Sequence, residues 1–269
     1  GFLLGGTAGR TTLNGEGLQH QDGHSHLLAS TVPNCISYDP AYAFELAVIV
    51  RRGLEHMYVD KAPVYYYITL MNEAYHHPAM PEAVEEDIVK GMYLLETLGD
   101  SAAPRIRILG SGALLPEARR AAQQLVDTYG LRAQVYSVTS YTELARNIQD
   151  HQREALIHPE SPATACHVSD LLNKGGWSDA PVIAVSDYVK ALPEQLRAAI
   201  DAPLRVLGTD GFGRSDTREQ LRAFFEVDSQ FIQYSALSEL VAAGHIQLNL
   251  NDLRDQLGIQ SDKPNPRKH

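Results

Sequence analysis

Short apolar segments alternate with helical patterns along the second half of this 269-residue chain, and this alternation limits the folds open to it. Each apolar segment has the length of a buried strand, and each precedes a stretch with apolar residues at helical spacing. Repeated strand–helix units form a parallel sheet with helices on both faces and right-handed crossovers. We therefore expect an α/β fold with a parallel or mixed sheet. The predicted strands cover 105–110, 133–139, 181–185 and 204–208, and the predicted helices cover 113–129, 141–156, 187–200, 216–225, 229–243 and 250–257.

The first hundred residues show the same alternation in a shorter form. Strands are predicted at 2–4, 35–38 and 64–70, of which the last is rich in β-branched and aromatic residues. Helices are predicted at 40–52 and 81–98. The run of Gly, Asp, Ser, Ala and Pro over 99–104 then interrupts the pattern, as a linker does. The sequence therefore predicts two domains, 1–100 and 101–269.

Charge and hydropathy argue against two classes of function. The formal net charge is −10 at pH 7, whereas a nucleic-acid-binding protein usually shows a basic stripe. No apolar run approaches the roughly 20 residues that cross a bilayer. Cys35 and Cys166 lie far apart in unrelated contexts, which indicates reduced thiols. We expect a cytoplasmic protein that binds neither nucleic acid nor a membrane.

The segment 15–26 is the strongest functional signal. It carries three histidines and two carboxylates among three glycines, a composition that suits neither a core strand nor an amphipathic helix. Histidine exchanges protons near neutral pH, and glycine lets the backbone approach a ligand closely. Glu16 and His20 stand four residues apart within it. We interpret this segment as the edge of an active site.

Other motifs favour structural roles. The glycines of 110–112 and of 208–213 follow predicted strands and could cradle a phosphate at a helix start. Neither motif has the dinucleotide-binding spacing, and tight strand-to-helix turns need glycine anyway, so we favour turns. Adjacent His76 and His77 would point in opposite directions on an extended segment, which argues against a shared metal ion. We expect no metal site in this chain, and we expect Cys35 to be a core thiol.

The chain resembles the homodimeric, bacterial-type decarboxylating component of the pyruvate dehydrogenase complex. The resemblance begins with GGTAGRTTLNGEGLQHQDGHSH at 5–26 and continues, in order, with several further stretches. It therefore covers the chain from end to end. Those stretches are PNCISYDPAY at 33–42, YYYIT at 65–69, NE at 72–73, PAMPE at 78–82, YSVTS at 136–140 and 205–215.

This family depends on thiamine diphosphate and shares its architecture with transketolase. By resemblance, 1–100 is the second half of a pyrimidine-binding domain and 101–269 a transketolase C-terminal-like domain. The chain begins without Met and enters the motif-rich segment almost at once, which suggests part of a longer polypeptide. The family's Mg²⁺ ligands, its diphosphate domain and the glutamate that activates the cofactor have no counterpart here. The fragment alone is therefore expected to be inactive.

The resemblance also assigns roles within the segment 15–26. The cofactor attacks the keto carbon of a 2-oxo acid, and the resulting alkoxide needs a hydrogen-bond or proton donor. His20 would provide this donor or hold the substrate carboxylate, and Glu16 would raise the imidazole pKa from nearby. Gln19, Asp22 and His24 are further candidates for the substrate pocket. In the family, the acyl group then passes to a lipoyl group of the acyltransferase component.

Several alternatives stay open. Transketolase has an arginine where this chain has Asp39, and an acidic residue disfavours a phosphorylated substrate. We therefore expect a small 2-oxo acid, although pyruvate and 2-oxobutyrate differ by one methylene, worth only about 1–3 kcal/mol of discrimination. A transketolase-like activity is the other enzymatic alternative. A non-catalytic dimerisation module is the alternative from another class, since homodimers with two-fold symmetry are common.

Overall fold

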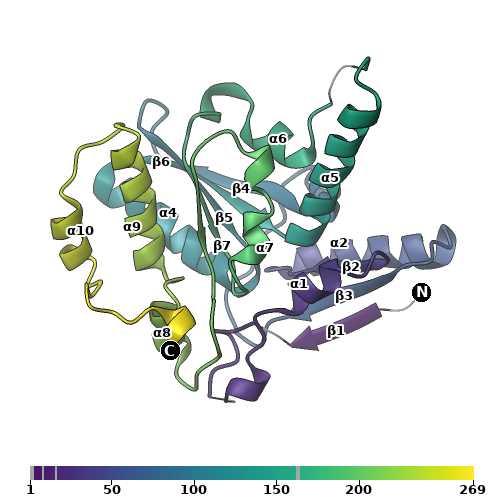
Figure 1. Ribbon diagram of the computed structural model, residues 1–269, viewed down its shortest axis with the longest axis horizontal. Helices are drawn as coiled ribbons and strands as arrows, with labels where there is room; N and C mark the ends of the chain where they lie inside the picture. Colours follow the sequence, from purple (N-terminus) through teal and green to yellow (C-terminus); the bar gives the residue numbers. More distant parts are fainter. Residues whose placement is uncertain (1–2, 8, 16, 162–163) are drawn as a thin grey trace.

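The computed structural model describes residues 3–7, 9–15, 17–161 and 164–269, and these form two sheets with helical layers (Figure 1). The first sheet is parallel, with the strand order β1-β3-β2. Helices α2 and α3 pack against this sheet, because their buried residues belong to the same hydrophobic core as those of β3. The elements of this region are β1 (Leu3–Thr7), α1 (Ser25–Ser30), β2 (Cys35–Tyr38), α2 (Ala43–Leu54), a π-helical turn (Glu55–Val59), β3 (Tyr65–Leu70) and α3 (Glu85–Lys90).

The second sheet has five strands in the order β4-β6-β5-β7-β8. Strand β4 is antiparallel to β6, and the other pairs are parallel, so the sheet is mixed as the sequence predicts. Its strands are β4 (Met92–Leu98), β5 (Arg105–Gly110), β6 (Arg132–Val138), β7 (Val182–Val185) and β8 (Leu204–Leu207). Its longer helices are α4 (Leu115–Tyr129), α5 (Tyr141–Ile157) and α9 (Ser229–Ala242), and its shorter ones are α6 (His167–Leu172), α7 (Ala191–Glu194), α8 (Arg218–Phe224) and α10 (Leu250–Gln256).

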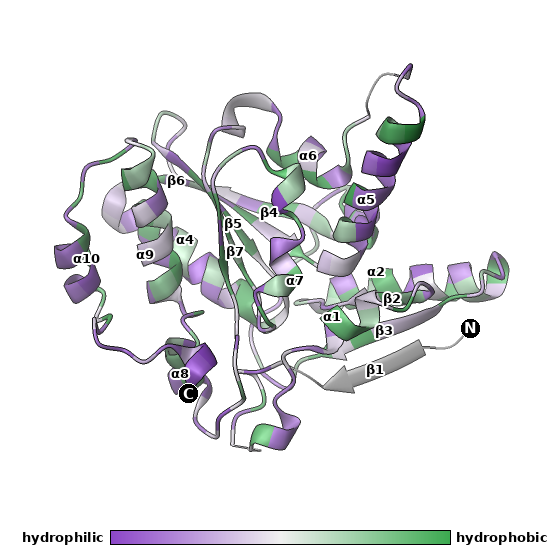
Figure 2. Cartoon of the chain, viewed as in Figure 1, coloured by the Kyte–Doolittle hydropathy of each residue, from purple (hydrophilic) through white to green (hydrophobic). Residues whose placement is uncertain are grey.

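Each face of the second sheet is covered by its own set of helices. Successive side chains of a strand point to opposite faces, so Ile108 joins the core under α4, α8 and α9 while Leu109 joins the core under α5, α6 and α7. Figure 2 shows the resulting concentration of hydrophobic residues on β5 and β7. The expected α/β fold with helices on both faces is therefore confirmed.

Two predicted helices differ from the structure. The predicted helix 81–98 ends at Gly91, whose left-handed φ of 109° closes α3, and the following residues form β4 instead. A side chain at Gly91 would collide with the carbonyl of Ser140, so the chain can reverse only with glycine there. The predicted helix 187–200 is divided into α7 and a 3₁₀ turn at Arg197–Ala199, with Pro193 inside α7.

Strand β4 also bears on the division into domains. It lies before residue 100 but pairs with β6 of the second sheet. We therefore propose that the two parts divide near Gly91, while the division at 100 remains a prediction. Within the described residues, no helix has the length and apolar character needed to span a membrane.

The segments that follow the strands of both sheets meet at the junction between them. Asp39 follows β2, and its backbone N–H donates to the carbonyl of Thr139, which follows β6. The N–H of Gly112, after β5, donates to the carbonyl of Asp39. The carboxyl ends of strands from the two sheets therefore face one another. The N-terminal segments 9–15 and 17–26 run across this junction (Figure 1).

Candidate active site

The segment that bears His20 is a short turn held at its two ends. A 3₁₀ turn covers Leu18–His20, and Gly17 before it has a φ of 88°, which favours glycine. The side chains of Gln19 and His20 are exposed. Within the described residues, no side chain is hydrogen-bonded to the His20 ring. Glu16 lies outside the described residues, and the roles predicted for His20 and Glu16 stay predictions.

Gln21, the next residue, is buried and links the turn to distant parts of the chain. Its side-chain N–H donates to the carbonyl of Leu13 at 3.0 Å, and its Oε1 accepts the backbone N–H of Arg214 at 2.6 Å. Asp22 and His24, the other pocket candidates, have local contacts. Asp22 Oδ1 accepts the N–H groups of His24 and Ser25 and so starts α1. The His24 Nδ1 atom lies 3.3 Å from an Arg10 nitrogen.

A buried carboxylate fixes the start of the same segment. Asp187 follows β7, and its Oδ1 accepts the Thr11 N–H at 2.9 Å and the Thr11 hydroxyl at 2.8 Å. Its Oδ2 accepts the Thr12 hydroxyl at 2.9 Å. Burial raises the pKa of Asp187, while the charge of Arg222 and these hydrogen bonds counteract the rise. Asp187 thus joins the N-terminal segment to the second sheet.

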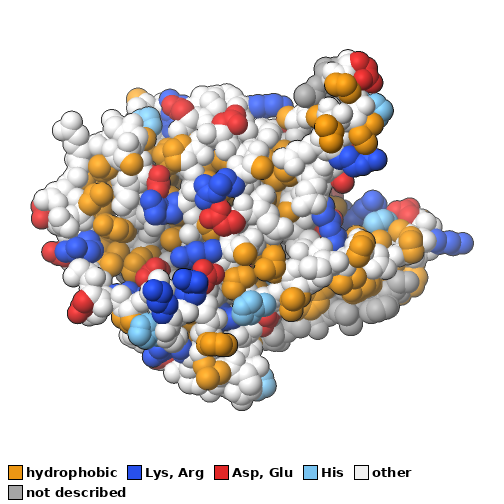
Figure 3. All heavy atoms as spheres, viewed as in Figure 1, with side chains coloured by type: hydrophobic (Ala, Val, Ile, Leu, Met, Phe, Trp, Pro, Cys, Tyr) orange, Lys and Arg blue, Asp and Glu red, His pale blue; other side chains and the backbone are white. Residues whose placement is uncertain are grey.

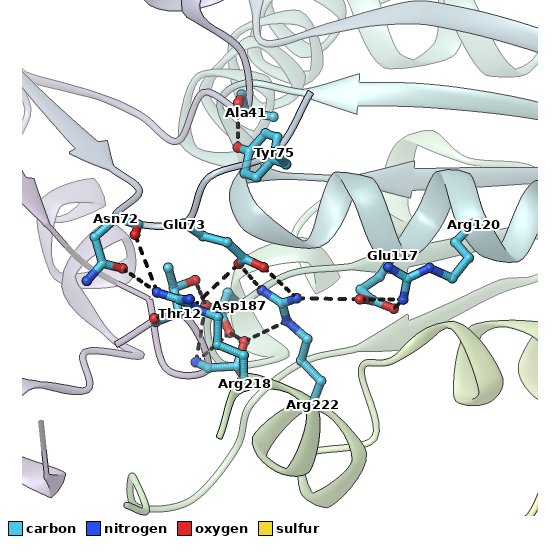
Figure 4. Close-up of polar contacts among 11 residues, drawn as sticks. Thr12, Ala41, Asn72, Glu73, Tyr75, Glu117, Arg120, Asp187, Arg218 and Arg222 are labelled. Carbon is cyan, nitrogen blue, oxygen red and sulfur yellow. Dashed lines mark hydrogen bonds and ion pairs between the residues drawn. The ribbon is translucent and has the colours of Figure 1, made fainter. Parts of the chain in front are cut away.

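An ion-pair network lies beside Asp187 and connects α4, α8 and the segment after β3 (Figure 4). Arg222 is positioned between Glu73 and Glu117 and also contacts the Thr11 hydroxyl. Arg218 donates to the carbonyl of Thr12 at 2.9 Å. Glu73, Glu117, Arg218 and Arg222 are among the residues that line a cavity of about 840 Å³, and His20 is not among them. Because the arginines are paired with carboxylates, we interpret the network as structural support.

A second polar cluster is buried beneath α1. The Thr69 hydroxyl donates to Asp39 Oδ1 at 2.6 Å, so its oxygen can accept a hydrogen bond from the N–H at His26 Nε2, 3.0 Å away. Burial lowers the pKa of His26 to about 4, so this imidazole is neutral at pH 7. Burial also raises the pKa of Asp39 to about 7, and the charge of Asp187 adds to that rise.

The burial of Asp39 makes stability depend on pH. An unfolded aspartate has a pKa near 3.9, so the folded state holds this proton more tightly and stability falls as pH rises from about 4 to 7. We expect the free energy of unfolding, relative to the variant Asp39→Asn, to fall by about 1 kcal/mol between pH 6 and pH 8. Urea unfolding at both pH values measures this, with the exposed Asp201→Asn variant as control. A parallel pH dependence of wild type and Asp39→Asn would contradict the assignment.

Asp39 is held inside the described part of the chain. Its side chain is buried and accepts a hydrogen bond from Thr69. The expectation that Asp39 selects against phosphorylated substrates stays a prediction. Sequence reasoning also missed Asp187, Thr11 and Arg222, whose only signal was their position after a strand or within a polar stretch.

Other parts of the protein contact the glycine turn at Gly112 and the adjacent histidines at 76 and 77. A side chain at Gly112 would lie 2.5 Å from Asp39 Oδ2, so an acidic group already occupies the space that a phosphate would need. His77 Nδ1 accepts the N–H of Ala43 at 3.0 Å, while His76 is exposed. Cys35 is buried, as expected of a core thiol. Among the described residues, no three His, Cys, Asp or Glu side chains are arranged around a metal site.

Comparison with known proteins places this arrangement in a family. The model of the transketolase-like C-terminal domain matches residues 91–228, and the model of the middle domain of the pyruvate dehydrogenase E1 component matches residues 1–78. The chain therefore belongs to the transketolase-like family. Transketolases from Leishmania mexicana and Pichia stipitis share the fold, with TM-scores of 0.61 and 0.62 at 16% identity, over 92% and 90% of this chain and 31% and 30% of theirs.

The relatives with similar sequences define the class of protein more narrowly than the shared fold does. The chain is 53% identical to the pyruvate dehydrogenase E1 component of Escherichia coli K12 over 270 residues, and 49% identical to that of Pseudomonas aeruginosa over 268 residues. Each match covers 99% of this chain and 30% of the relative. The resemblance to the decarboxylating component is thus confirmed, and the chain spans about a third of the length of the curated relatives it matches.

Proposed function

We propose that this chain is the C-terminal part of a pyruvate dehydrogenase decarboxylating component. The observation that carries the proposal is the 53% identity to the Escherichia coli E1 component across 99% of the chain. The exposed His20 on a turn held at both ends adds a chemical reason. The full polypeptide would oxidatively decarboxylate pyruvate and transfer the acetyl group to a lipoyl group of the acyltransferase component. We further propose that it acts in the cytoplasm as a homodimer.

We propose that the principal ligands of thiamine diphosphate lie elsewhere in the full polypeptide, as the resemblance implies. The candidate phosphate turn at Gly112 faces Asp39, whose carboxylate lies in the space that a phosphate would need. We derive no step through the cofactor. When bound, the cofactor would supply the electron sink that lets carbon dioxide leave.

We propose that His20 acts directly on the substrate. An imidazole with no hydrogen-bond partner among the described side chains can donate to the keto oxygen of a 2-oxo acid as negative charge develops there. Gln19, in the same turn, is exposed and could contact the substrate carboxylate. Asp22 and His24 stay candidates for the pocket, although Asp22 already has a structural role at the start of α1.

The proposal predicts that the full polypeptide is active and that this part alone is not. With thiamine diphosphate and Mg²⁺, the full polypeptide should release carbon dioxide from pyruvate faster than from 2-oxobutyrate, measured with ferricyanide as electron acceptor. The 269-residue chain alone should be inactive and should show no heat of thiamine diphosphate binding in calorimetry. Activity of the full polypeptide on sugar phosphates instead of 2-oxo acids would contradict the proposal, as would tight, Mg²⁺-dependent binding by the chain alone.

A further inference from the structure

The glycine-rich loop 208–214, between β8 and α8, has no role in the function described so far. It lies against the segment that bears His20, although the two are separated by almost two hundred residues. The Arg10 side chain donates to the carbonyl of Gly211, and Arg214 donates its backbone N–H to Gln21. The loop therefore contacts the N-terminal segment on both sides of the His20 turn.

Glycine at 213 permits this close approach. A side chain there would lie 2.7 Å from Gln21 Oε1 and 3.4 Å from the carbonyl of Leu18. Gly211, with a φ of 106°, brings the loop equally close to the C-terminal tail, because a side chain there would lie 2.5 Å from the carbonyl of Pro266. The loop is thus packed between the tail and the His20 turn.

Gln21 connects the loop 208–214 to its neighbour His20. Only 4% of Gln21 is exposed, whereas its neighbour His20 is exposed. Each end of its side-chain amide is used, with Leu13 on one side and Arg214 on the other. Because Gln21 directly follows His20, these two hydrogen bonds hold the chain on the C-terminal side of the imidazole.

We propose that Gln21 is a positioning residue for His20, and that the loop 208–214 is the fixed support against which Gln21 holds the imidazole. This inference rests on the proposed function, because His20 must act on the substrate for its position to affect a rate. It assigns the glycines of 208–213 to close packing against Gln21 rather than to phosphate binding. A group misplaced by about 1 Å can cost up to about 100-fold in rate.

The kinetic test is a double-mutant cycle in the full polypeptide. We expect Gln21→Ala to lower kcat for pyruvate about 10-fold with little change in KM, and to have no further effect in a His20→Ala background. A residue that acts only through overall stability would lower the rate by the same factor in both backgrounds. That result, or an unchanged kcat in Gln21→Ala, would overturn the inference. Gln152→Ala, which alters an exposed glutamine of α5, is the matched control.

A second measurement does not depend on activity. Amide hydrogen exchange of residues 17–21 in the 269-residue chain should become faster in Gln21→Ala and remain unchanged in Gln152→Ala. If Gln21→Ala does not fold, Gly213→Ala takes its place, because the added methyl group would displace the Gln21 amide. Unchanged exchange in the folded variant would overturn the inference. If His20→Ala alone keeps full activity, the catalytic role of His20 fails, and the exchange result still decides whether Gln21 holds the turn.

Discussion

Replacing His20 with alanine in the full polypeptide should lower kcat for pyruvate by about 100-fold, the lower end of the usual general acid–base contribution. The reason is that, by our proposal, the exposed imidazole donates to the developing negative charge on the substrate. The measurement is steady-state decarboxylation at saturating thiamine diphosphate and Mg²⁺. Because the backbone of the turn is held by Gln21 and not by the imidazole, the variant should keep the stability of the wild type.

Two controls make the result specific. His245→Ala removes an exposed histidine from a loop remote in sequence and should leave kcat unchanged. Added imidazole should restore part of the rate in His20→Ala, because a free imidazole molecule can enter the space left by the side chain and donate in its place. A wild-type rate in His20→Ala would remove this residue from the mechanism while leaving the family assignment intact.

Replacing Asp187 with alanine should destabilise the fold by about 3 kcal/mol, since the substitution leaves several buried donors without an acceptor. These donors are the N–H and hydroxyl of Thr11 and the hydroxyl of Thr12, all bonded to a carboxylate with no exposed surface. The Arg222 charge would also lose a nearby negative group. Urea unfolding of the 269-residue chain, followed by circular dichroism, measures the change.

The matched control is Asp201→Ala, which alters an exposed aspartate whose side chain has no such partners. We expect its free energy of unfolding to lie within about 0.5 kcal/mol of wild type. The isosteric Asp187→Asn should fall between the two, because its amide oxygen still accepts hydrogen bonds from one side. A loss below about 1 kcal/mol in Asp187→Ala would show that Thr11 and Thr12 find other acceptors.

The second sheet could be predicted from the sequence because its strands are short, buried and followed by glycine or polar turns. Strand β4 could not, because its Met, Leu and Glu residues also suit a helix and because its pairing with β6 depends on residues some forty positions later. Tertiary pairing decided the conformation of that segment, as it often does for sequences of intermediate propensity.

The candidate site was predictable only as a segment. Its composition pointed to 15–26, and the role of His20 in that segment stays a prediction. The contacts that hold the segment were not visible, because Gln21 meets Arg214 and Thr11 meets Asp187 across 193 and 176 residues. The burial of Asp39 could not be predicted either, because it depends on contacts with Thr69 and with the second sheet.

These distant contacts set the order in which the protein can mature on the ribosome. A chain elongating at roughly 5–20 residues per second needs about 10–40 seconds to travel from Gln21 to Arg214. Until then, Gln21 lacks the partner that fixes it. The turn that bears His20 therefore takes its final shape only after most of this region has been synthesised, and a chain truncated before residue 214 lacks this support.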